Sequence, residues 1–121
     1  MSEKSKLREV RFYGRDFQDF FNQLSPAAKA KVVWTLKLVE EIPRIPEIYF
    51  KHLESTQGLY EIRVHAVGGA IRLFCFFDQG KLIIVTHGFI KKSQKTPRRE
   101  IEKAHEIKRR YEVEKQKNGI T

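Results

Sequence analysis

Positively charged residues between His87 and Glu100 (HGFIKKSQKTPRRE) form the part of the sequence best suited to chemistry. No acidic residue precedes Glu100 in this run, and its cations are Lys91, Lys92, Lys95, Arg98 and Arg99. The run follows an apolar, strand-like segment and leads into a helical pattern, so regular structure is expected to hold both of its ends. Such a loop can bind a polyanion, above all a phosphate chain. A solvated basic loop without a ligand is equally compatible with the charge alone.

Three strand-like segments precede or border the cationic run. Residues 59–66 alternate between apolar and polar side chains, residues 70–77 return after a turn at Gly68-Gly69, and residues 82–87 follow a second turn at 78–80. The near-continuous apolar character of the last segment predicts a central strand that is buried on both faces. The three segments are therefore expected to form a meander that leads into the cationic run.

Arg63 and Arg72 are expected to lie close together on this sheet. A two-residue turn at Gly68-Gly69 places His65 opposite Arg72, which makes the two arginines diagonal neighbours on one face, roughly 7–8 Å apart. Arg72 interrupts an apolar strand, where a cation needs a partner. An ion pair with Glu61 on the same face is one explanation. A clamp for phosphate, formed by the planar guanidinium fork, is the other, and the spacing leaves both open.

Other reactive side chains give weaker signals. The four histidines have no metal-ligand spacing and Cys75 has no cysteine partner, so neither a metal nor a cofactor is expected. No nucleophile elbow and no glycine-rich phosphate loop is present in the sequence. His87 borders the cationic run and has an ordinary pKa near 6.5, so acid–base work is conceivable there. An ordinary polar residue at a strand end is the favoured explanation of His87.

The N-terminal third predicts a short strand at 7–14 and two adjacent helices that form a hairpin. Apolar residues spaced i, i+3, i+4 and i+7 from Phe17 to Leu24 predict the first helix and assign its stripe to the core. Ser25-Pro26 is a capping pair for the second helix, which Pro43 and Pro46 end. The buried face of this second helix is expected to consist of Ala27, Ala30, Trp34 and Leu38.

A last helix is predicted to begin at Thr96-Pro97. One side of it should pack on the sheet through Ile101, Ala104, Ile107 and Tyr111. Residues 115–121 are expected to form a frayed tail. The elements together predict an α+β domain, with an N-terminal helical hairpin packed on a small, mostly antiparallel sheet and a C-terminal helix.

Length and charge favour one domain, residues 1–121, with a phosphate-bearing partner. The net charge is +9 and the sequence pI is near 9.8. Residues 1–60 carry 10 cations and 8 anions, whereas residues 61–121 carry 14 cations and 7 anions, so the excess lies in the second half. An acidic protein partner would fit the same numbers. The single cysteine and the absence of a signal or membrane-spanning segment in the sequence predict a cytoplasmic protein without membrane contact.

Three segments, GLYEIRV (58–64), IRLFCFF (71–77) and HGFIKKSQKTPRREIEKA (87–104), resemble the RelE/ParE superfamily of bacterial toxins. More narrowly, they resemble its HigB-like branch, which is related to phage-derived proteins. The resemblance is best over residues 49–110. It implies a microbial-RNase-like fold, a helix-turn-helix antitoxin (HigA-like) as partner, and metal-independent endoribonuclease cleavage of mRNA on the translating ribosome.

The resemblance also implies roles for individual residues. The strand arginine of the family corresponds to Arg72, a cation on the preceding strand to Arg63, and the cation at the end of the last strand to Lys92, beside Lys91. Arg72 and Arg63 would stabilise the phosphoryl charge. Lys91 or Lys92 would transfer a proton, with His87 as the reserve candidate.

The nucleic-acid backbone would be held by Lys95, Arg98 and Arg99. Glu61 departs from the pattern, since some relatives carry a lysine there, and a tyrosine near the start of the last helix in some relatives is replaced by arginine. Two other functions remain open. One is a ParE-like, non-hydrolytic inhibitor of DNA gyrase, and the other is an inactive module that only binds nucleic acid or protein.

Overall fold

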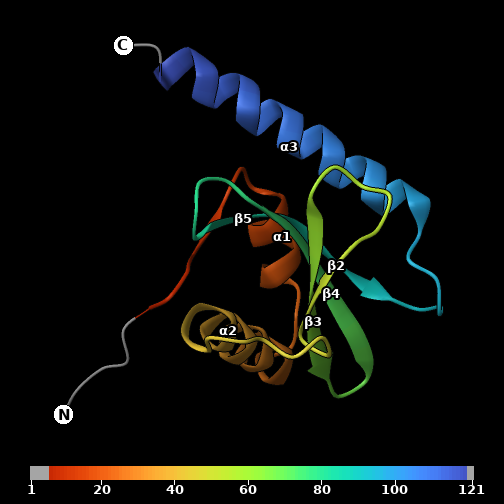
Figure 1. The fold of residues 1–121 in the computed structure, drawn as a ribbon. Coiled ribbons are helices and arrows are strands. Elements are labelled where there is room, and N and C mark those ends of the chain that lie inside the picture. The colour runs from red at the N-terminus through yellow and green to blue at the C-terminus, as the bar shows by residue number, and fades with distance from the viewer. Residues whose placement is uncertain (1–5, 120–121) are drawn as a thin grey trace.

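The computed structural model describes residues 6–119, and its framework is a five-stranded sheet with helices on both faces (Figure 1). The strands lie in the order β1-β5-β4-β3-β2. Their bounds are β1 Glu9–Phe12, β2 Phe50–His52, β3 Leu59–Ala66, β4 Gly69–Phe77 and β5 Leu82–Lys91. β1 runs parallel to β5, and the other neighbouring pairs are antiparallel. The predicted α+β class and mostly antiparallel sheet are confirmed.

Helices α1 (Asp16–Asn22) and α2 (Pro26–Glu41) cover one face of the sheet, and α3 (Arg98–Gly119) crosses the other (Figure 1). The α1/α2 side has a core whose buried residues are mostly aliphatic, and in it Val32 and Val39 of α2 meet the strands. The α3 side is richer in aromatic rings and includes Phe74, Phe76 and Phe89. Each sheet face therefore has its own core, and the polar residues discussed below interrupt the α3 side.

β5 is a central strand, as its apolar sequence predicts, and it is longer than expected. It continues past His87 to Lys91, and α3 begins at Arg98, so only residues 92–97 form a loop. Its register against β4 shifts between Phe74 and Cys75, which leaves Thr86 as the extra residue of a bulge. The first part of the cationic run is consequently strand, and its side chains are held by the sheet.

The β3–β4 hairpin turns at Val67 and Gly68, so the register predicted from a Gly68-Gly69 turn is wrong. Ala66 pairs with Gly69, and Gly68 alone of the two glycines takes a positive φ, of 89°. The observed and predicted registers differ by two residues, which leaves every side chain on the same sheet face. The apolar pattern cannot distinguish two such registers. The shift places Arg63 directly opposite Arg72 instead of diagonal to it.

The buried face of α2 also differs from the prediction. Val32, Thr35 and Val39 are buried, whereas Trp34 is 46% exposed. Ala27 and Ala30 are exposed and Leu38 is half-buried. The helix carries two apolar stripes with helical spacing, and the branched valines of one of them pack on the sheet. Trp34 instead lies at the sheet edge, edge-on to Tyr49.

The C-terminal helix is longer than the sequence predicts, and the sheet has an additional strand at its edge. α3 continues to Gly119, so residues 115–119 are helical where a frayed tail was expected, and residues 120–121 lie outside the described part. Ala104 and Ile107 of α3 are buried against the sheet as predicted. The short edge strand β2 was not expected. Within residues 6–119, none of the helices has the length and apolar character that crossing a bilayer requires.

Candidate functional site: a cationic cluster

Glu61 lies at the centre of the candidate site, on the α3 side of the sheet. Its side chain is 1% exposed. Its Oε1 atom accepts a hydrogen bond from Nε of Arg63 at 3.0 Å and lies 3.7 Å from Nε of Arg72. Its Oε2 atom accepts a hydrogen bond from the Thr96 hydroxyl at 3.3 Å. One carboxylate therefore connects β3, β4 and the loop 92–97.

The sheet holds the two arginines against each other. Arg63 and Arg72 are register partners, a relation in which Cβ atoms lie roughly 4.5–5.5 Å apart and like charges repel. Glu61 offsets that repulsion, so the ion pair that the sequence left open is present. The Arg72 side chain is 11% exposed, and its Nε is a buried nitrogen without a hydrogen-bond partner. Burial lowers the pKa of Arg72, Glu61 raises it and Arg63 lowers it.

Two lysines complete what we call the cationic cluster: Arg63, Arg72, Lys91 and Lys51 around Glu61. Lys91 is the last residue of β5, and Lys51 is the register partner of Glu61 on β2. Burial lowers the pKa of Lys91; Glu61 opposes this, and Arg72, Arg63 and Lys51 lower the pKa further. Four cations thus surround one carboxylate. Their excess positive charge, partly shielded from water, favours an added anion.

The other predicted cations lie outside this cluster. Lys92 is exposed at the strand end, and Lys95 is exposed in the loop. Arg98 and Arg99 are 90% and 85% exposed; Nε of Arg98 lies 3.4 Å from Glu102, and Nε of Arg99 lies 3.7 Å from Glu100. These four residues form a solvated rim next to the cluster. Exposed pairs of this kind contribute little to stability, which leaves their charge available to a polyanion.

The structure does not bring His87 into the cationic cluster. Its side chain is 1% exposed beneath α3, and Phe74 lies between it and Glu61 in the strand register. Nε2 of His87 is 3.0 Å from Glu100, and Nδ1 is 3.1 Å from the Thr86 hydroxyl. Burial lowers the pKa of His87 and the hydrogen bond to Glu100 opposes the shift. Both ring nitrogens are engaged, Nε2 by Glu100 of α3 and Nδ1 by the neighbouring Thr86, and we do not include His87 in the proposed chemistry.

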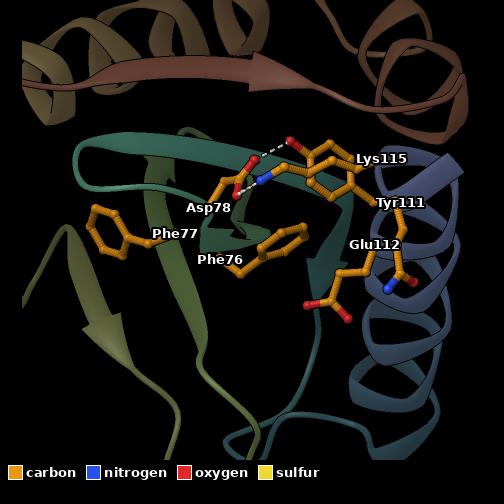
Figure 2. A pocket seen from close by; sticks show the side chains of 7 residues that line it. Phe76, Phe77, Asp78, Tyr111, Glu112 and Lys115 are labelled. Carbon is orange, nitrogen blue, oxygen red and sulfur yellow. Dashed lines mark hydrogen bonds and ion pairs between the residues drawn. The ribbon is translucent and has the colours of Figure 1, made fainter. Parts of the chain in front are cut away.

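A second polar group lines a hollow of about 520 Å³ at the far end of β4 (Figure 2). Asp78 accepts hydrogen bonds from the Tyr111 hydroxyl and the Lys115 ammonium group, both on α3. Burial and the bond to Asp78 raise the pKa of Tyr111 to about 12. The polar groups satisfy one another, so we assign this cluster to fixing α3 on the sheet and not to binding.

Lys51 and Thr96 are the site residues that sequence reasoning missed. Lys51 was missed because β2 was not expected, although the stretch Ile48–His52 is rich in residues that favour strands. Thr96 was assigned to the start of the last helix only. Glu61 was named as an ion-pair partner, but its position between two arginines follows from the hairpin register. Within the described part of the chain, no three His, Cys, Asp or Glu side chains gather as they would around a metal ion.

Comparison with known proteins gives a family for this arrangement. A model of the family described as "Phage derived protein Gp49-like (DUF891)" matches residues 19–109 of the 121, a range that includes the whole cationic cluster and the loop 92–97. No curated protein matches the chain. The chain belongs to the Gp49-like family of phage-derived proteins, a family of RelE/HigB-like toxins.

Proposed function

We propose that this protein is the toxin of a type II toxin–antitoxin pair of the HigB kind and that it acts as an endoribonuclease on mRNA at the ribosome. The observation that supports this proposal most strongly is the pairing of Arg63 with Arg72 around one carboxylate oxygen, with Lys91 close by. These side chains carry excess positive charge, and a phosphodiester would supply the negative charge that balances it. The family membership supplies the toxin context.

The proposed reaction needs no metal. The ribose 2′-OH attacks the adjacent phosphorus, the bond to the 5′-oxygen of the next nucleotide breaks, and a 2′,3′-cyclic phosphate and a 5′-OH are left. Negative charge builds on the non-bridging oxygens as the transition state forms. Arg72 and Arg63 donate hydrogen bonds to those oxygens from the terminal nitrogens of their guanidinium groups, since Nε of Arg72 is buried beside Glu61.

Proton transfer is assigned to the lysine end of the cluster. Arginine keeps its proton at neutral pH, so neither arginine can act as a general acid or base. Lys91 has a lowered pKa, which makes its ammonium group a stronger acid, and it donates the proton to the departing 5′-oxygen. The proton of the 2′-OH leaves to water. Glu61 is enclosed by Arg63 and Thr96 and acts as a positioning residue.

The rim cations bind the surrounding RNA. Lys95, Arg98 and Arg99 contact phosphates of the message or of the ribosome, and Lys92 joins them at the strand end. Such contacts give affinity that falls steeply as salt is raised. The partner that neutralises the toxin is a helix-turn-helix, HigA-like antitoxin, whose gene is expected beside this one.

Purified protein added to a translation extract tests the proposal. The expected result is cleavage of ribosome-bound message in the presence of EDTA, with a 2′,3′-cyclic phosphate at each new 3′ end. Intact mRNA together with broken DNA in a gyrase assay would replace the proposal with the ParE-like function. Intact RNA and intact DNA, with antitoxin binding preserved, would replace it with a binding module.

A further inference from the structure

Three aromatic side chains, which we call the aromatic row, link α2 to the sheet face that carries the cationic cluster. Trp34 of α2 meets Tyr49 edge-on, with ring centroids 5.8 Å apart. Tyr49, just before β2, meets His65 of β3 edge-on at 5.7 Å. The row is accessible, since Trp34 is 46% exposed and His65 is exposed.

The row is continuous with the cationic cluster. His65 lies two residues beyond Arg63 on the same sheet face, a step of roughly 6–7 Å along a strand. The backbone N–H of Arg63 donates to the carbonyl of Tyr49 at 2.8 Å. Nε2 of His65 is 2.8 Å from the Ile48 carbonyl. These bonds hold the row at a fixed distance from the arginines.

Cations stand at both ends of the row. The ammonium group of Lys31 lies over the Trp34 ring, 4.6 Å from its centroid. Arg63 stands at the other end, with its Nη1 donating to the Glu47 carbonyl at 3.4 Å. Aromatic faces between positive charges suit a ligand that has flat, polarisable groups along an anionic backbone. An apolar peptide would use the rings and leave the cations unmatched.

We infer that the aromatic row is a stacking platform for the bases of single-stranded RNA next to the phosphate held by Arg63 and Arg72. The inference rests on the proposed function and adds a subsite to it. The bases flanking the cleaved phosphate stack on His65 and Trp34, and Lys31 contacts the backbone beyond them. Stacking on a ring does not depend on base identity, so the platform orients the strand without reading its sequence.

Trp34 is the only tryptophan of the chain, so its fluorescence reports on the platform directly. The probe is a short oligoribonucleotide with 2′-O-methyl groups, which the proposed chemistry cannot cut. Its titration into the wild-type protein is expected to quench Trp34. A probe of the same length without bases should bind through its phosphates and leave the fluorescence unchanged. Equal quenching by both probes, or by neither, overturns the inference.

Variants give a second, independent readout. Trp34→Ala is expected to weaken oligoribonucleotide binding roughly 5- to 150-fold, the range of one base–aromatic stack, and Trp34→Phe to keep most of the affinity. Val33→Ala is the matched control, because Val33 is the neighbouring residue on α2 and is 48% exposed. If Trp34→Ala kept its RNA affinity and lost antitoxin binding, this surface would be a protein interface, and the inference would be overturned.

Failure of the inference can be separated from failure of the proposed function. Base-dependent quenching by a protein that leaves mRNA intact would support the platform and refute the nuclease. Normal cleavage of mRNA without quenching, unaffected by Trp34→Ala, would support the nuclease and refute the platform.

Discussion

Arg63 and Arg72 lie directly opposite each other on β3 and β4, and the Nε atoms of both approach one oxygen of Glu61. Two cations in register repel each other unless an anion lies between them. Glu61, which is buried on the α3 side of the sheet, supplies that anion. Fold stability and the candidate chemistry therefore depend on the same carboxylate.

The substitution Glu61→Gln is expected to destabilise the fold by roughly 3 kcal/mol, because it leaves largely buried cations without a counter-charge. Inorganic phosphate should restore more stability to this variant than to the wild type, since the anion takes the place of the lost charge. Urea unfolding with and without phosphate measures both effects. The control is Glu106→Gln, at an exposed carboxylate of α3. It should neither lose this stability nor gain more from phosphate than the wild type does. Equal stability and an equal phosphate response in the two variants would contradict the role of Glu61 as the counter-charge of the two arginines.

The pH dependence of mRNA cleavage distinguishes the two candidate lysines. Burial and the neighbouring cations lower the pKa of Lys91, so a rate that needs its proton should fall as pH rises through a value below the ordinary lysine pKa of about 10.4. Lys91→Gln should remove this alkaline limb and slow cleavage about 100-fold. Lys92→Gln, which changes an exposed side chain, should keep the limb. A limb that persists in Lys91→Gln would assign the proton to another group.

Asp78 should make the fold sensitive to acid. Burial acts to raise the pKa of Asp78, but the bonds from Lys115 and Tyr111 lower it overall (Figure 2). A carboxyl with a lowered folded pKa stabilises the fold above its unfolded pKa, about 3.9, and this contribution is lost as pH falls through the folded value. Asp78→Asn is expected to cost about 1–2 kcal/mol at neutral pH.

Unfolding by urea at neutral pH and at about pH 2 measures this contribution. The difference between wild type and Asp78→Asn should shrink in acid. Asp19→Asn, at an exposed carboxylate paired with Arg15, provides the comparison and should change stability little at either pH. If the difference in unfolding free energy between wild type and Asp78→Asn did not change with pH, the charge of Asp78 would be excluded as its cause.

At Gly88, β5 packs tightly against side chains of α1 and β4. A Cβ atom at this position would lie 2.7 Å from side-chain atoms of both Leu73 and Phe20. Gly88→Ala is therefore expected to destabilise the fold by about 1–3 kcal/mol. Gly69→Ala places its methyl 3.4 Å from Ile90 and should cost far less. Thermal unfolding of the two variants checks the contrast, and similar melting temperatures would contradict the packing described for Gly88.

Much of the fold follows from periodicity in the sequence. The alternation of Leu59–Ala66, the apolar run of β5 and the apolar stripe of α3 each predict an element that the structure contains. Registers and helix faces do not follow in the same way. A two-residue slip of the hairpin keeps every side chain on its face, and α2 carries two apolar stripes, so tertiary packing decides both.

The candidate site was predictable in its residue types and not in its arrangement. Arg63, Arg72 and Lys91 were identified from sequence and lie together, whereas Lys51 depends on a three-residue edge strand too short to predict. The burial of His87 depends on the bulge at Thr86 and on Glu100 of α3, which are long-range features. Local sequence patterns hold no information about either.

The most direct test of the central claim is to induce wild type and Arg72→Ala in cells and to map mRNA 5′ ends. Removing a transition-state donor should reduce cleavage about 100- to 1,000-fold and relieve growth arrest, while the variant remains folded and antitoxin-binding. Arg15→Ala, which removes a cation that is 84% exposed and lies outside the cluster and its rim, is the control and should still cleave. New 5′ ends that appear with wild type and Arg15→Ala but not with Arg72→Ala are the predicted result. Undiminished cleavage by folded Arg72→Ala would contradict the account.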